Sequence, residues 1–119
     1  MNYYLEERTA KFGENIIAFC RILDSNAINK PIINQLIRSS TSIGANYMEA
    51  NNASSRNDFR NKIFICKKET QETKHWLRML AQAVPEKKKQ IILFLKESHE
   101  LILIFQKIIN SLKNKKNEN

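Results

Sequence analysis

The sequence predicts an all-α protein, an antiparallel up-down-up-down four-helix bundle, from three observations. Only two glycines and two prolines occur in 119 residues, too few for the turns of many short strands. In four separate segments apolar residues recur at alternating spacings of three and four, the period of one face of a helix. The breaks between these segments are short, so each helix folds back on its predecessor. This length fits a single domain over residues 1–119.

The four helices are expected at about 4–24, 30–53, 56–83 and 86–113, before a polar tail at 114–119 that frays. Asp24-Ser25-Asn26 breaks the first, and Pro31 suits the first turn of the second, where a missing N–H costs nothing. The third begins at Ser55, whose hydroxyl can cap the helix and is followed three residues later by Asp58. Pro85 separates the third from the fourth.

The charge and composition of the chain indicate which kinds of partner and location to expect. The formal net charge is +8, and residues 55–83 and 84–119 carry an excess of four positive charges each. Such asymmetry favours a polyanionic partner, with a merely soluble lysine-rich surface as the alternative. No signal peptide or membrane-spanning run is evident, so we expect a soluble, cytoplasmic protein that does not bind a membrane.

Chemistry at a catalytic or metal site is not indicated. Cys20 and Cys66 lie inside apolar helical patterns without metal-ligand spacing, and we expect them to be buried as small hydrophobic residues. Glu72 and His75 form one Glu-x-x-His motif, but a di-iron bundle needs two, and Lys96 stands where the second Glu before His99 would be. We therefore expect no enzyme activity, no cofactor and no metal.

A row of cations on the third predicted helix is the main functional feature that the residues themselves indicate. At 100° per residue its five members fall within about 40°, over about 33 Å of helix, and away from the core stripe. We expect them to face outward, where such a row can follow a phosphate backbone without reading sequence. The row consists of Arg56, Arg60, Lys67, Lys74 and Arg78.

The fourth predicted helix is apolar over more than one face. Its apolar arc is near 200°, whereas a surface helix of a single chain needs about 100°. We predict that the surplus packs on another subunit, with deeper burial within one chain as the alternative. The predicted oligomer contacts are Ile92, Leu95, Ile102 and Ile109.

Two segments carry a resemblance to a known family. Residues 35–50, QLIRSSTSIGANYMEA, resemble the signature QLxRSxxSIGANxxEA of four-helix-bundle proteins encoded in intervening sequences of 23S ribosomal RNA genes. Asp58-Phe59, Lys62, Lys67-Lys68-Glu69, Glu72-Thr73 and Trp76-Leu77 are similar to the same family's DFxxK…KExxET-xWL block. The similarity spans nearly the whole chain. Thr70 and His75 depart from it, standing where Ala and an aromatic residue such as Tyr are usual.

The resemblance implies a homopentameric ring without enzymatic activity. The family's relatives include the accessory variability protein of diversity-generating retroelements, which binds nucleic acid and a reverse transcriptase. The resemblance thus points to nucleic acid, RNA in particular, and to a possible protein partner.

The signature residues have a structural interpretation. Antiparallel pairing of the second and third helices predicts contacts of Arg38 with Glu72 or Glu69, and of Glu49 with Lys62. Gly44 inside a helix costs about 1 kcal/mol relative to Ala, which close approach of another helix would offset. Hydroxyls at 39–42 are expected to bond back to the preceding turn. The structural set is Arg38, Ser42, Gly44, Asn46, Glu49, Asp58, Phe59, Lys62, Glu69, Glu72 and Trp76.

These features together predict a non-enzymatic, self-assembling bundle that binds nucleic acid through repeated basic surfaces. The alternative is a protein-interaction scaffold that docks a partner such as a reverse transcriptase.

Overall fold

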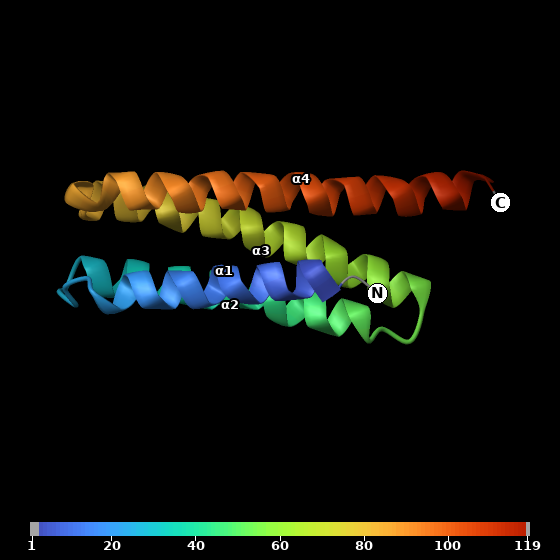
Figure 1. The fold of residues 1–119 in the computed structure, drawn as a ribbon, viewed down its shortest axis with the longest axis horizontal. Coiled ribbons are helices and arrows are strands. Elements are labelled where there is room, and N and C mark those ends of the chain that lie inside the picture. The colour runs from blue at the N-terminus through green and yellow to red at the C-terminus, as the bar shows by residue number, and fades with distance from the viewer. Residues whose placement is uncertain (1–2, 119) are drawn as a thin grey trace.

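A computed structural model describes the backbone of residues 3–118 and the side chains of residues 3–113. Its elements are α1 (Tyr3–Arg21), α2 (Asn29–Asn51), α3 (Arg56–Ala83), a 3-10 turn η1 (Pro85–Lys87) and α4 (Lys88–Glu118). Successive helices run back and forth along one axis of a molecule that measures 53 × 22 × 20 Å (Figure 1). The described residues include no strand, and the predicted all-α four-helix architecture is confirmed.

The start of α3 follows the predicted chemistry. Ser55 is extended, and its Oγ accepts a hydrogen bond from the Asp58 amide at 3.0 Å. This bond satisfies one of the amides that the first turn of a helix leaves without a partner. The observed bounds of α3 agree with the prediction.

The first two helices are slightly shorter than predicted. α1 ends at Arg21, because the next amide, that of Ile22, already donates to the Phe19 carbonyl in a tighter turn. The Asn26 carboxamide oxygen accepts the Asn29 amide at 2.8 Å and so supports the first turn of α2.

The observed bounds of the fourth helix differ more from the predicted ones. It begins with the 3-10 turn at Pro85, and α4 then continues to Glu118, beyond the predicted end at 113. The backbone of the predicted polar tail is helical up to Glu118, since this segment contains no Gly or Pro to end a helix. The C-terminal part of α4 extends past the other helices in Figure 1.

All four helices bury side chains in a common core. Burial also raises the pKa of the Cys20 thiol to about 11 and that of the Cys66 thiol to about 12, because a thiolate is poorly solvated there. Both cysteines are free and buried, as predicted. The fully buried apolar side chains include Ile16, Leu36, Ile43, Ile63, Leu77, Ile91, Leu101 and Phe105.

Over the described residues, every helix is too short or too polar to cross a bilayer.

Candidate nucleic-acid interface

Charged residues of the signature tie α2 to α3. An Arg38 guanidinium nitrogen lies 3.3 Å from a Glu69 carboxylate oxygen, and Arg38 also pairs with Glu72. Lys62 Nζ lies 3.0 Å from a Glu49 oxygen, and this carboxylate raises the pKa of Lys62. The predicted contacts are therefore present, and they fix the register of two antiparallel helices.

Trp76 completes this network. It is half-buried against the core, and its indole N–H donates to Glu72 Oε2 at 3.2 Å. The ring of His75 meets the Trp76 ring edge-on at a centroid distance of 4.9 Å. With its N–H engaged and part of its ring covered, Trp76 is held as a structural side chain.

The small polar residues of the signature satisfy their own hydrogen bonds in place. Ser42 Oγ donates to the Arg38 carbonyl at 2.7 Å, and Asn46 donates to the Ser42 carbonyl at 2.8 Å. Buried Thr73 Oγ1 donates to Ser39 Oγ at 2.9 Å, which joins α3 to α2. None of these bonds prepares a nucleophile, since each hydroxyl binds a carbonyl or another hydroxyl.

Gly44 allows α1 to approach α2 closely, as predicted. A Cβ at this position would lie 3.3 Å from the backbone nitrogen of Ala10 and from the Thr9 carbonyl group. Phe59, another member of the structural set, is half-buried and packs against the core.

The predicted cation row lies along the side of α3 that faces α4. Lys67 Nζ donates to Gln106 Oε1 of α4 at 2.6 Å, and an Arg56 nitrogen donates to the Leu112 carbonyl at 2.9 Å. Arg60 lies over the Phe64 ring at 5.4 Å, Lys74 is half-buried, and Arg78 is exposed.

The predicted outward orientation of the whole row is therefore wrong. The α4 helix packs beside this face of α3, and the long side chains extend over it with their apolar stems partly covered. The row follows the valley between α3 and α4, and only Arg56 and Arg78 are exposed.

None of the five cations of this row forms an ion pair among the described side chains. Among the described side chains, Arg8, Lys11, Arg38 and Lys62 are the basic residues that form ion pairs. The contacts of the row are instead to an amide, a backbone carbonyl and an aromatic ring. Its positive charge is not neutralised within the chain.

A hollow of about 590 Å³ opens in this valley beside the N-terminal half of α4. Lys74 of α3 lines it together with residues of α4. The apolar members are Ile92, which is 39% exposed, and half-buried Leu95. The polar members from α4 are Lys96, His99 and Glu100.

The four predicted oligomer contacts on α4 differ in how far they are buried within the chain. Ile109 is 5% exposed and belongs to the core, so it is wrong as a subunit contact. It follows Ile91 by 18 residues, five full turns at 100° per residue, and points in the same inward direction. Ile92 is exposed, and Leu95 and Ile102 are half-buried.

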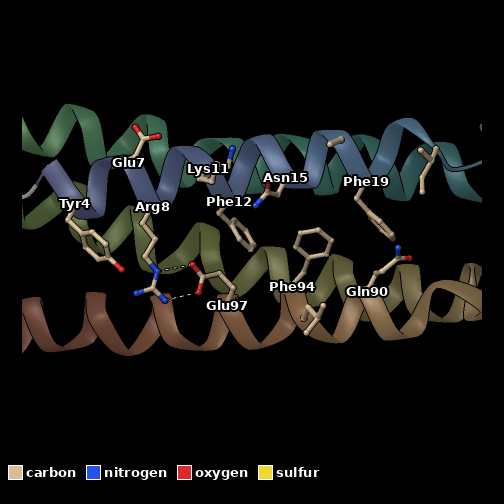
Figure 2. Close-up of a pocket in the computed structure, with 13 residues that line it drawn as sticks. Tyr4, Glu7, Arg8, Lys11, Phe12, Asn15, Phe19, Gln90, Phe94 and Glu97 are labelled. Atoms are coloured by element: carbon tan, nitrogen blue, oxygen red, sulfur yellow. Dashed lines mark hydrogen bonds and ion pairs between the residues drawn. The ribbon is translucent and has the colours of Figure 1, made fainter.

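A second opening, a groove of about 780 Å³, separates α1 from α4 on the other side of α4. Figure 2 shows Phe12 and Phe19 of α1 and Phe94 of α4 along it. The Phe94 ring lies 6.2 Å from Phe12 and 5.3 Å from Phe19 between centroids. Exposed Leu93 also lines the groove.

Two opposite charges that line this groove, those of Arg8 and Glu97, are paired. Arg8 of α1 donates two hydrogen bonds, of 2.8 and 2.7 Å, to the Glu97 carboxylate of α4 (Figure 2). A third contact, of 3.2 Å, joins Arg8 to Glu100. These bonds raise the pKa of Arg8 and lower that of Glu97, because each charged form is held by the other.

The sequence reasoning missed Arg8, Glu97, Lys96 and His99. The segment Lys96-Glu97-Ser98-His99-Glu100 contained the signal. Buried Ser98 fixes the inward direction, and residues three apart share a face. Glu97 and Glu100 thus contact Arg8 of α1, whereas Lys96 and His99 lie on the hollow beside α3, whose edge Glu100 also lines.

Within the described side chains, no three His, Cys, Asp or Glu residues gather in a way that could hold a metal ion. Glu72, the acid of the Glu-x-x-His motif, is bound by Arg38 and Trp76.

Comparison with known proteins defines the relationship of the chain. The 23S rRNA-intervening sequence protein family matches residues 5–107. A solved structure from Bacteroides thetaiotaomicron VPI-5482, described as a protein of unknown function from the S23 ribosomal protein family, is similar with a TM-score of 0.76 and 32% identity. The similarity covers 87% of this chain and 96% of the other. Among curated proteins, none matches. The chain thus belongs to the 23S rRNA-intervening sequence protein family.

Proposed function

We propose that this protein is a non-enzymatic, self-assembling module that binds nucleic acid, RNA in particular, along the valley between α3 and α4. The observation that carries the proposal is the row of five cations without acidic partners among the described side chains. Unneutralised cations release the counterions of a phosphate backbone when they bind it, which favours association at low salt. The family's description as 23S rRNA-intervening sequence proteins makes RNA the polyanion to test first.

We propose that subunits of the oligomer contact one another through the α1/α4 groove, on the side of α4 opposite the α3/α4 valley. A neighbouring subunit over the α3/α4 valley would bury Lys74 without an acidic partner, and a buried unpaired charge is costly. The α1/α4 groove has its Arg8 already paired and exposes Leu93, so a second copy can cover it at smaller electrostatic cost. We infer a pentamer, as in the family that the sequence resembles, which would repeat the basic valley five times and multiply weak contacts.

This assignment of the two surfaces changes the role predicted for the apolar residues of α4, which the helical period indicated as subunit contacts. Ile92 and Leu95 share the hollow with Lys74, so a subunit that covered the two apolar residues would also cover the cation. They are better placed to contact the nucleic acid.

Charge reversal tests the binding surface. The triple variant Arg60→Glu, Lys67→Glu, Lys74→Glu should weaken binding of a fluorescent structured RNA at least about tenfold at about 50 mM salt, and should lower the salt slope by about two or three. The matched control, Arg21→Glu, Lys30→Glu, Lys68→Glu, makes the same change of net charge at exposed positions outside the cation row and the α1/α4 groove, and should retain most of the affinity. Fluorescence polarisation against salt concentration measures both.

Equal losses in the two triple variants would show a general charge effect and contradict the assigned surface. Absence of RNA binding by the unmodified protein would reject the function. The alternative is a scaffold for a protein partner, and the resemblance to retroelement accessory proteins makes a reverse transcriptase the partner to test. Under that alternative, charge reversal in the valley leaves partner binding intact.

A further inference from the structure

We propose that the hollow at Lys74, Lys96 and His99 is a subsite for one unpaired nucleotide, so that the protein prefers single-stranded nucleic acid to duplex. The inference rests on the proposed function and adds to it a class of substrate. The cation row by itself predicts only a polyanion, because phosphates are common to single strands and duplexes.

The size and lining of the hollow support a nucleotide. Its volume of about 590 Å³ lies within the range of small-ligand sites. Such sites combine an apolar surface with a few polar groups, and here Ile92 and Leu95 supply the apolar part. A base that is paired inside a duplex cannot reach these side chains, whereas an unpaired base can lie on them.

The charged groups fit a phosphate at the edge of the hollow. Lys74 comes from α3, and Lys96 and His99 come from adjacent turns of α4, so three nitrogen donors surround one space from two helices. A lysine provides N–H donors, and an imidazole provides at least one N–H in either protonation state. None of these three residues forms an ion pair among the described side chains.

One carboxylate also lines the hollow, and its negative charge would repel a bound phosphate. Glu100 lines the hollow, but its Oε2 lies 3.2 Å from an Arg8 guanidinium nitrogen on the side toward α1. Arg8 therefore offsets part of its charge. With two lysines facing one partly neutralised acid, the hollow remains positive.

The order of residues 96–100 on α4 explains how this short segment contributes both to the α1/α4 groove and to the α3/α4 valley. Glu97 and Glu100 contact Arg8 of α1, while Lys96 and His99 each precede one of these acids and lie about 100° away around the helix. The acids are thereby drawn toward the α1/α4 groove, and the bases remain at the nucleic-acid valley.

The direct test compares two labelled RNA probes of about 12 nucleotides, an unpaired oligouridylate and a duplex of the same length, at one salt concentration. The full-length protein should bind the unpaired probe at least about fivefold more tightly. The Ile92→Asn variant should lose at least about threefold in affinity for the unpaired probe and nothing for the duplex. Its matched control is Leu103→Asn, which replaces an exposed apolar residue of α4 outside the hollow and should change neither affinity.

A charge-neutralising pair tests the phosphate contacts. Lys74→Gln with Lys96→Gln should lower the salt slope for the unpaired probe by about 1.4, at about 0.7 for each lost phosphate contact. Arg21→Gln with Lys30→Gln removes the same charge from exposed positions of α1 and α2 outside the groove and the hollow, and should leave that slope unchanged.

The outcomes separate the subsite from the function on which it rests. Equal binding of both probes, with Ile92→Asn behaving like Leu103→Asn, overturns the subsite and leaves a salt-dependent polyanion-binding protein. Failure of the unmodified protein to bind either probe overturns the proposed function and the subsite with it.

Discussion

Arg8 and Glu97 form the shorter of the two described ion pairs that connect the first and last helices. Their carboxylate and guanidinium groups meet in a bidentate arrangement and are each less than one-third exposed. Bidentate, partly desolvated pairs are stronger than ordinary surface pairs because the geometry is fixed and solvent screens them less. The pair therefore sets the separation of α1 and α4 across the groove in Figure 2.

The Glu97→Gln variant should lower the free energy of unfolding by about 1 kcal/mol near pH 7. The hydrogen bond from Arg8 lowers the pKa of Glu97 below its value in the unfolded chain, so this stabilisation is present above the unfolded pKa of about 4.3 and is lost as pH falls through the folded pKa. Urea unfolding of both proteins should show the difference shrinking below about pH 4. A difference that persists unchanged at pH 3 would contradict this account.

Among single residues, the ion-pair predictions that rested on the antiparallel pairing of α2 and α3 are confirmed. Antiparallel pairing was sufficient to bring Arg38 to Glu69 and Glu49 to Lys62. The bond from Arg8 to Glu97 could not be found in this way, because 88 positions lie between the partners and their approach depends on how α1 packs in the complete bundle.

The helices themselves were predictable because their signals are local. Ser55 caps α3, and the repeated apolar spacing marks each inward face. Ile109 was misassigned although five whole turns return it to the direction of Ile91, which helix geometry alone could have shown. The orientation of the cation row was beyond such reasoning, because it depends on the side on which α4 packs against α3.

Two helical glycines provide a matched pair for testing the packing of α1 on α2. Gly44→Ala should lower the free energy of unfolding by up to about 2 kcal/mol, since the added Cβ would lie 3.3 Å from backbone atoms of α1 that cannot move independently of the helix. Gly13→Ala should raise it by up to about 1 kcal/mol, because its Cβ would meet Thr41 at an ordinary 3.5 Å and Ala favours helix.

Urea unfolding monitored by circular dichroism measures both glycine variants. Stabilisation by Gly44→Ala equal to that by Gly13→Ala would show that the close approach of α1 to Gly44 is absent in solution.

For the molecule as a whole, α4 separates two surfaces of different character. On one side lies a groove that holds the paired Arg8 and Glu97 and whose lining is largely apolar. On the other lies a valley with unneutralised cations and an apolar hollow. Burial of the first between subunits leaves the second free, so assembly and nucleic-acid binding can occur together.

Light scattering coupled to size-exclusion chromatography, with and without a structured RNA, tests this central claim most directly. The account predicts a particle of five 14.0 kDa chains whose mass increases when RNA is added at low salt. Leu93→Glu, in the groove, should reduce the mass toward one chain, whereas Leu103→Glu should not. A particle with the mass of one chain, unchanged by RNA, would contradict the account.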